Sequence, residues 1–239
     1  MFNPDPHLQI IQFDSRHRCI VIDDALVDPH GLKRETVAQR SAFRPVDFNA
    51  YPGIYLPASP EQSAGLDGFF RQHVRRLFDA RRSLHMHVRF SMVTLPPQAL
   101  RPFQRLCHSD NAGVPPQQSI QACVLYLFDD ASLGGTGFYQ AIRPANEMSA
   151  LFNDATRLSG EVFTERYGIK PGYMLESNAY FARVGGVPAK WNRMIFYDGS
   201  VLHSGDILAP ARLSEDPAVG RLTLNGFFTC SRNAAARSP

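Results

Sequence analysis

The chain has 239 residues, of which 44% are hydrophobic and 20% are charged, as in an ordinary globular protein with a sizeable buried core. This composition argues against a disordered chain, and no apolar run approaches the length of a membrane span. The net charge of +3 is too small to indicate a nucleic-acid partner.

The predicted elements begin with a short strand and two helices. Residues 19–24 form an apolar run typical of a buried strand, and Asp28 followed by Pro29 predicts a helix that continues to about Gln39. A capping-box sequence at residues 59–62 predicts the second helix. Its apolar residues recur at helical spacing and are expected in the core: Leu66, Phe69, Phe70, Val74, Leu77 and Phe78.

Strands dominate the rest of the chain. From His85, apolar and polar residues alternate, as in a strand with one buried face, until the prolines at 96–97. One helix is expected to interrupt the later strands, from about Asn146 to a stop at Gly168. The other strands are predicted at residues 121–128, 173–184, 193–197 and 221–230.

This order of elements predicts an α+β fold that is mainly β, with a double-stranded β-helix (jelly roll) as its core. The sequence has no internal repeat and no clear linker, so we expect residues 1–239 to form one domain. Residues 24–82 would supply helical support and residues 85–232 the β core, with a helical insertion at 146–168.

The cysteines and the start of the sequence indicate a cytoplasmic protein. The four cysteines have no Cys-x-x-Cys spacing, so we expect reduced thiols. The first twenty residues lack the basic start and apolar stretch of a secretory signal. The cysteines are Cys19, Cys107, Cys123 and Cys230.

Two histidines and one aspartate are candidate metal ligands. His108 and Asp110 are two positions apart, so their side chains point to the same side of an extended chain. The second histidine, His203, follows a later strand-like run. Two imidazoles and one carboxylate fill three of six positions on Fe(II) and leave three for a co-substrate and dioxygen. We therefore expect a catalytic iron site, although affinity alone does not exclude other divalent ions.

Several segments around these ligands occur in a recognisable order. They are an opening strand at 19–26, the His-x-Asp step at 108–110, a strand at 124–129, a double-glycine turn at 133–138, the distal histidine strand at 192–204 and a closing strand at 220–228. This order resembles the iron and 2-oxoglutarate-dependent dioxygenases, specifically a bacterial subfamily of their prolyl-4-hydroxylase-like branch. The resemblance supplies a reaction class and no substrate.

The resemblance implies that 2-oxoglutarate is a co-substrate held by a basic residue on the closing strand. Arg221 opens that strand and offers a bidentate fork for a carboxylate. In the family this residue follows the distal histidine by about ten positions. Arg221 lies eighteen positions beyond His203, and Arg212 lies nine beyond it. We prefer Arg221, because Arg212 lies in a stretch at 209–218 that is typical of a loop insertion.

Three further residues are expected near 2-oxoglutarate. Tyr126 matches a family position where a tyrosine hydroxyl helps to hold the co-substrate, and a core tyrosine is the equally weighted alternative. Thr223 and Asn225 alternate with buried residues on the closing strand and are weaker candidates for the cavity wall.

Two other polar pairs receive structural interpretations. His85 and His87 form a His-x-His pair without a matching carboxylate, so we interpret them as surface or core polar residues. Asp198 and Asp206 flank the distal histidine and could orient its ring, but turn formation is the preferred interpretation.

The sequence thus predicts an enzyme that uses Fe(II), 2-oxoglutarate and dioxygen to hydroxylate a C–H bond, releasing succinate and carbon dioxide. Asp110 argues against halogenation, while desaturation, ring closure and demethylation stay open because they share the first step. The substrate would be a small molecule or peptide, with no nucleic-acid or membrane partner; a homo-oligomer stays open. The helix at 146–167 and the loop at 209–218 are expected to shape the entrance.

Two alternatives stay open as well. One is a non-catalytic ligand-binding or regulatory protein on the same fold, and the other is a cupin-like metalloenzyme that does not use 2-oxoglutarate.

Overall fold

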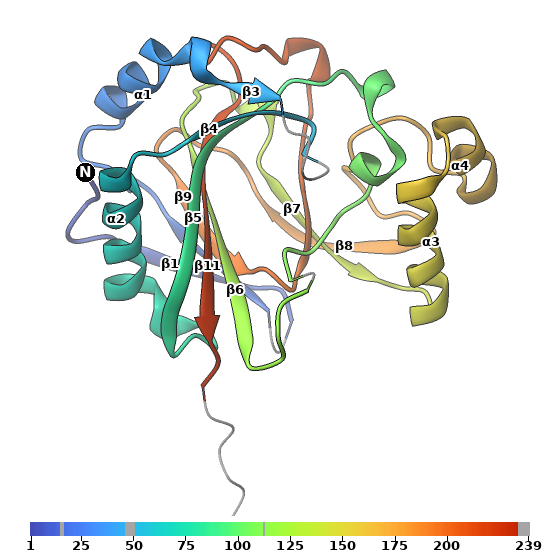
Figure 1. Cartoon of the computed structure of the whole chain (residues 1–239), viewed down its shortest axis with the longest axis horizontal. Helices are drawn as coiled ribbons and strands as arrows, with labels where there is room; N and C mark the ends of the chain where they lie inside the picture. The colour runs from blue at the N-terminus through green and yellow to red at the C-terminus, as the bar shows by residue number, and fades with distance from the viewer. Residues whose placement is uncertain (15–16, 46–50, 112, 234–239) are drawn as a thin grey trace, which may run out of the picture.

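Two antiparallel β-sheets stacked on each other form the centre of the computed structural model, which describes residues 1–14, 17–45, 51–111 and 113–233 (Figure 1). The larger sheet has eight strands in the order β1-β2-β9-β6-β11-β5-β4-β3, and the smaller has three in the order β10-β7-β8. The larger sheet consists of β1 (Leu8–Gln12), β2 (Arg18–Ile22), β3 (Arg44–Pro45), β4 (Gly53–Pro57), β5 (Arg82–Val93), β6 (Gln118–Tyr126), β9 (Met194–Asp198) and β11 (Leu222–Ser231). The smaller sheet consists of β7 (Thr136–Ala141), β8 (Phe181–Val187) and β10 (Leu202–Gly205). This arrangement confirms the predicted jelly roll.

Helices α1 (Pro29–Ala38) and α2 (Pro60–Phe69) lie beside the larger sheet, on the side away from the smaller one (Figure 1). Both begin as predicted: Asp28 accepts a hydrogen bond from the Gly31 amide, and Ser59 forms a reciprocal capping box with Gln62. A π-helical turn and a 3-10 turn extend α2 to residue 77. The apolar side of α2 is buried against the strands, with Leu66 and Phe70 fully covered.

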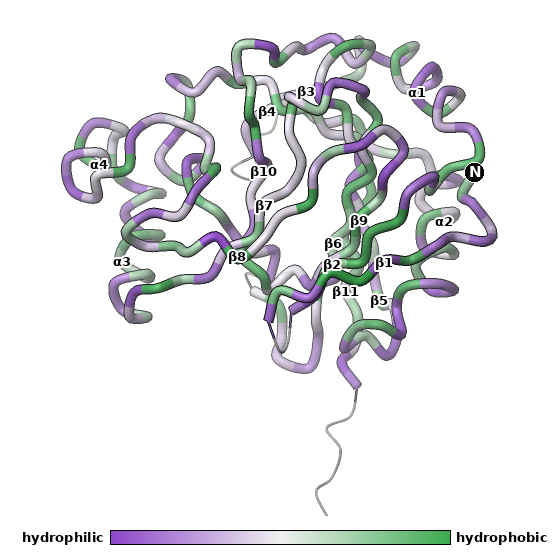
Figure 2. Tube along the Cα trace, turned by 180° about the vertical axis from the view of Figure 1, so that it is seen from behind, coloured by the Kyte–Doolittle hydropathy of each residue, from purple (hydrophilic) through white to green (hydrophobic). Residues whose placement is uncertain are grey.

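Alternation along β5 gives the larger sheet its two faces. Phe90 and Met92 pack on the helix side, in the cluster that includes α2, whereas Tyr126 and Tyr197 from β6 and β9 pack between the sheets. Figure 2 shows the hydrophobic strand segments of the larger sheet at the centre of the molecule, with α1 and α2 on one side and α3 and α4 on the other. None of the helices in the described part of the chain is long and apolar enough to cross a membrane.

The predicted helical insertion is two helices instead of one. Helix α3 (Ala145–Arg157) ends before Ser159, which caps α4 (Gly160–Tyr167) by accepting from the Val162 amide. Gly168 ends α4 in the left-handed conformation, as predicted. The strand predicted at 173–184 begins only at Phe181, because residues 173–180 form irregular structure with bends before β8.

Candidate metal centre

The three predicted ligands come together at the edge of the smaller sheet. His203 lies in β10, and His108 lies opposite it as an isolated bridge. The amide of each histidine donates to the carbonyl of the other, at 3.0 and 2.8 Å. The Asp110 amide donates to the Gly199 carbonyl at 2.7 Å, which fixes the second ligand of the His-x-Asp step. The step therefore runs beside β10 like a short strand, and its two ligands share one side.

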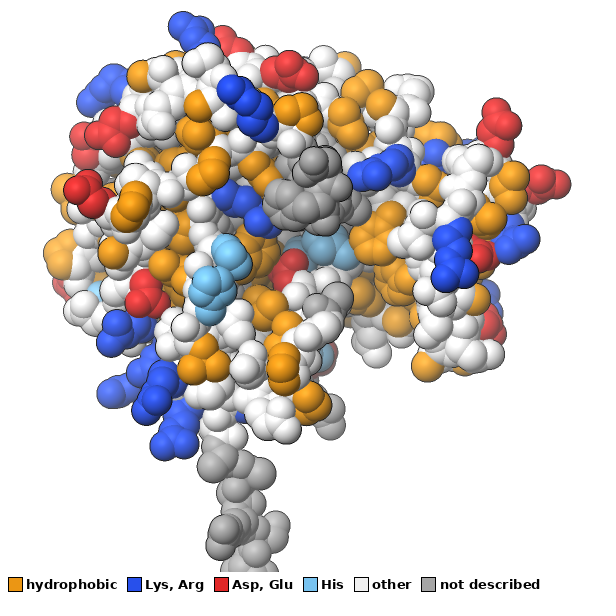
Figure 3. Space-filling view, in the orientation of Figure 1, with side chains coloured by type: hydrophobic (Ala, Val, Ile, Leu, Met, Phe, Trp, Pro, Cys, Tyr) orange, Lys and Arg blue, Asp and Glu red, His pale blue; other side chains and the backbone are white. Residues whose placement is uncertain are grey.

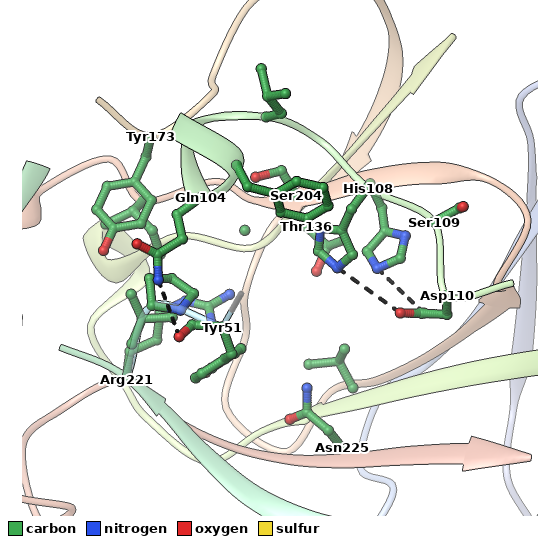
Figure 4. Close-up of a pocket in the computed structure, with 18 of the residues that line it drawn as sticks. Tyr51, Gln104, His108, Ser109, Asp110, Thr136, Tyr173, Ser204, Arg221 and Asn225 are labelled. Carbon is green, nitrogen blue, oxygen red and sulfur yellow. Dashed lines mark hydrogen bonds and ion pairs between the residues drawn. The ribbon is translucent and has the colours of Figure 1, made fainter. Parts of the chain in front are cut away.

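The metal-binding atoms converge. They all lie within 4.8 Å of one another. The two imidazoles lie side by side, with 4.5 Å between ring centroids, and the Asp110 carboxylate faces both: Oδ2 is 3.5 Å from Nε2 of His203, and Oδ1 is 4.0 Å from Nε2 of His108 (Figure 4). One side of the three candidate ligands faces the cavity and the other wall residues drawn in Figure 4.

The His203 ring is fixed in the orientation that a metal ligand needs. Its Nδ1 lies 2.9 Å from the carbonyl oxygen of Val201, so Nδ1 carries the proton and Nε2 presents its lone pair to the centre. The ring also packs against Tyr197, with 4.7 Å between centroids. A backbone carbonyl thus orients the ring, and neither flanking aspartate does so.

Burial sets the charge of the three groups. It lowers the pKa of His203 to about 4, whereas the His108 side chain is 45% exposed, and partial loss of solvent followed by the neighbouring His203 ring lowers its pKa. Burial raises the pKa of Asp110. Both imidazoles are therefore neutral near pH 7, which is the form that coordinates a metal.

The donor set fits a divalent cation. The Asp110 Oδ2 atom is buried and accepts no hydrogen bond from the described residues. Such an oxygen costs free energy unless a donor or a cation compensates it. A cation facing Asp110, His108 and His203 would supply that compensation, and two imidazoles with one carboxylate suit Fe(II).

These ligands lie at the wall of a cavity of about 300 Å³, a size typical of small-molecule sites. Figure 3 shows the front face hollowed near its centre, with histidine and basic side chains around the hollow. Most of the wall comes from β4, β5, β9, β10 and β11 and from the segment after β5. Its polar residues beside the ligands include Tyr51, Arg89, Gln104, Tyr173, Arg221 and Asn225.

The two candidate anchors for a carboxylate have different surroundings. Arg221 is buried in the cavity wall, and its Nε and Nη2 donate to the carbonyls of Leu133, Gly134 and Gly135 at 2.8 to 3.1 Å. No described residue accepts from its Nη1. Arg212 is 63% exposed and pairs with Asp130 at 2.9 Å. The residues of the cavity wall therefore include Arg221 and not Arg212.

The other predicted co-substrate residues divide into two groups. Asn225 lies in the cavity wall, and its amide oxygen accepts from the Thr223 hydroxyl at 2.6 Å. Thr223 and Tyr126 are buried behind the wall. The Tyr126 hydroxyl lies 2.8 Å from the Thr136 hydroxyl, and Thr136 itself lines the cavity. The structure thus places Tyr126 as a core tyrosine supporting Thr136.

The pair His85 and His87 and the pair Asp198 and Asp206 were interpreted as structural residues, and three of these four residues are placed accordingly. The Nε2 atoms of His85 and His87 lie 2.9 Å apart on the exposed part of β5. Asp198 accepts from the Ser200 amide in a turn, as predicted. Asp206 differs, because it forms an ion pair of 2.6 Å with Arg183.

Two segments expected to shape the entrance do not line the described part of the cavity wall. They are the helical insertion, α3 and α4, and residues 209–218. Helix α3 packs behind Phe103, which lines the cavity. The ring centroids of Phe103 and Phe152 of α3 lie 6.1 Å apart. Conversely, sequence reasoning missed Arg89, although its position between partly buried Val88 and buried Phe90 in the alternating strand places it on the cavity face.

The sequence and the fold were compared with known proteins. A family model described as "Family of unknown function (DUF6445)" matches residues 4–228. No curated protein matches the sequence. The solved structure of the non-heme alpha ketoglutarate dependent carbocyclase SnoK from nogalamycin biosynthesis has 14% identity and a TM-score of 0.53, covering 89% of this chain and 79% of that one.

A second solved structure is HygX from Streptomyces hygroscopicus with nickel and 2-oxoglutarate bound. It has 11% identity and a TM-score of 0.46, covering 89% of this chain and 82% of that one. The SnoK likeness, at its low identity, establishes a shared fold.

Proposed function

The chain belongs to the DUF6445 family, whose function is unknown, and we propose that it is an Fe(II)- and 2-oxoglutarate-dependent dioxygenase. The reaction would be hydroxylation of a C–H bond in a small-molecule or peptide substrate. Iron, when bound, would activate dioxygen at the expense of 2-oxoglutarate, which leaves as succinate and carbon dioxide.

One observation carries this proposal: His108, Asp110 and His203 converge at the wall of a cavity that also contains a buried arginine. A three-ligand set leaves positions on the metal for a chelating keto acid and dioxygen. Arg221 supplies a guanidinium for the distal carboxylate of that acid. A cupin-like metalloenzyme without 2-oxoglutarate would have no use for this second feature.

The chain's own residues would prepare the site in three ways. The Val201 carbonyl holds the His203 ring with Nε2 toward the metal. The carbonyls of the double-glycine turn hold Arg221 in a fixed direction, so that its remaining N–H groups are preorganised for a carboxylate. Asn225 offers an amide in the wall near Asp110 (Figure 4).

The similarity in fold to SnoK supports the reaction class, because that enzyme is described as alpha ketoglutarate dependent. The prolyl-4-hydroxylase-like branch and the cytoplasmic location stay predictions from the sequence, as do hydroxylation itself and the single-domain organisation.

Turnover of 2-oxoglutarate tests the proposal. The purified protein with Fe(II), 2-oxoglutarate, ascorbate and dioxygen is expected to form succinate and carbon dioxide from the 2-oxoglutarate slowly even without its substrate, and an Asp110→Ala variant is expected to lose this activity. Asp154→Ala is the matched control, because Asp154 pairs with Arg166 near the surface and is not among the described residues of the cavity wall. A wild-type protein that binds iron but forms no succinate would favour one of the two alternatives.

A further inference from the structure

Two exposed histidines on β5 have no role in the proposed oxygenase chemistry. His85 and His87 are two positions apart, so their rings leave the strand on the same face. Their Nε2 atoms lie 2.9 Å apart, and the ring planes are nearly perpendicular, at 86°. Two imidazole nitrogens, each able to bind a metal, therefore meet at the surface of the protein.

The sheet leaves this pair accessible at the rim of the cavity. The pairing of β4 with β5 ends at Arg89, so both histidines lie beyond the covered part of the strand. On the other side, β11 places Phe227 opposite His87 and Thr229 opposite His85. Phe227 lines the cavity, and the pair therefore stands next to its wall.

A β-bulge adjoins the pair. The register between β5 and β11 shifts after Thr229, which leaves Leu84 as an extra residue directly before His85. A bulge bends its strand and redirects neighbouring side chains, and bulges are over-represented beside functional sites. The extra residue thus lies where it can set the direction of the His85 ring.

The hydrogen bond between the two rings stabilises the fold only slightly. One ring donates its Nε2 proton to the Nε2 lone pair of the other. Both rings are exposed, so water competes for these nitrogens, and the net contribution of an intramolecular hydrogen bond is about 1 kcal/mol on average. A ligand that binds both nitrogens would use the same geometry with a larger gain in free energy.

The spacing of the nitrogens fits two adjacent positions on a tetragonal or octahedral ion. With metal–nitrogen bonds of about 2.0–2.1 Å, a separation of 2.9 Å corresponds to a nitrogen–metal–nitrogen angle of about 90°. A tetrahedral ion would need about 3.4 Å between the nitrogens. Tetragonal coordination by nitrogen and oxygen is typical of Cu(II) and Ni(II), and Cu(II) binds most tightly among the divalent ions of the first transition row.

The His87 ring is in the form that coordinates a metal at neutral pH. Partial loss of solvent, followed by the neighbours His85 and Arg89, lowers the pKa of His87. The ring is therefore neutral near pH 7, and no proton has to be displaced from it as a charge.

The pair is separate from the three candidate iron ligands. Asp110 is held at the end of β9 by its bond to the Gly199 carbonyl, whereas the pair lies on β5. Three strand spacings separate β9 from β5 in the larger sheet, which corresponds to about 14 Å. An ion bound by the pair would therefore be a second ion.

We propose that His85 and His87 form a second metal site at the rim of the cavity, which takes a divalent transition ion of tetragonal or octahedral geometry such as Cu(II), with water in its remaining positions. On binding, the ring that donated its Nε2 proton takes the Nδ1–H tautomer. Both Nε2 lone pairs then bind the ion, and both rings stay neutral. The site goes beyond the proposed oxygenase function and does not depend on it.

Equilibrium dialysis against Cu(II) at pH 7 tests the proposal. The wild type is expected to bind two ions per chain, and a variant with His108→Ala and His203→Ala is expected to keep one. In that background, either His85→Gln or His87→Gln should weaken the remaining site about 100-fold or more, because each substitution removes the chelate. His30→Gln is the matched control, since His30 is an exposed histidine on α1 and its removal should change nothing.

Two results would overturn the proposal: no copper site left in the His108→Ala, His203→Ala protein, or a site that keeps its affinity in both His85→Gln and His87→Gln. Electron paramagnetic resonance of the remaining site should show coupling of copper to two nitrogens, and coupling to a single nitrogen would also refute the pair. If the double variant fails to fold, as judged by urea unfolding, the wild-type background decides, because His85→Gln or His87→Gln should lower the copper count there by one ion per chain.

Discussion

Replacement of Arg221 by lysine tests which residue anchors 2-oxoglutarate. Arg221 makes three bonds to the carbonyls of the double-glycine turn, and the ammonium of lysine can replace about one of them. Loss of about two charge-assisted bonds corresponds to about 2–4 kcal/mol of the free energy of unfolding. Loss of the fork would also weaken 2-oxoglutarate binding about 10- to 100-fold. Urea unfolding measures the first quantity, and anaerobic calorimetry with Fe(II) measures the second.

Arg212→Lys is the matched control. Arg212 is exposed and pairs with Asp130 on the surface, so we expect a change of less than about 0.5 kcal/mol in stability. Binding of 2-oxoglutarate should be unchanged in this variant. Normal binding by Arg221→Lys together with weak binding by Arg212→Lys would refute the assignment and move the anchor to the 209–218 loop.

Three other predictions follow from the fold. Gly134→Ala should lower the free energy of unfolding by about 3 kcal/mol or more, because Gly134 has a φ of +81° and a Cβ there would lie 1.3 Å from the Asp206 carbonyl oxygen; an unchanged urea midpoint would contradict this. Arg193 and, to a lesser degree, Lys190 lower the pKa of Asp23 to about 2, so this pair stabilises the protein above pH 3.8 and the effect is lost as the pH falls toward 2. Asp23→Asn should therefore cost about 1 kcal/mol at pH 7, discounted for exposure, with the difference from wild type disappearing at low pH. Ellman's reagent should find no fast-reacting thiol in the native protein and four after unfolding, since all four cysteines are free and buried; a fast native reaction would show an exposed thiol.

Local signals in the sequence predicted the helices well. The cap at Asp28 and the capping box at Ser59 act within a few residues, so each fixes a helix start without knowledge of the fold. The break between α3 and α4 was missed, because the continuous apolar stripe hid the cap at Ser159. Strands β7 and β10 were missed as well, since each is short and is defined by a partner distant in sequence.

The convergence of the three candidate ligands could be predicted in part, because their pattern is partly local. His108 and Asp110 share one side by strand geometry alone, whereas the pairing with His203 is visible only in the fold. Arg89 stacks on rings from β4 and β11, and this contact could not be predicted because no sequence pattern places those rings beside it. Asn225 fell on the cavity wall as predicted, while Tyr126 turned out to lie behind it.

Anaerobic titration with Fe(II) and then 2-oxoglutarate detects chelation of the keto acid at the metal. We expect a metal-to-ligand charge-transfer absorption band that saturates at one 2-oxoglutarate per iron, and loss of the band in His203→Ala. A folded wild-type protein that holds iron and develops no such band on addition of 2-oxoglutarate would show that the site is not that of a 2-oxoglutarate-dependent enzyme.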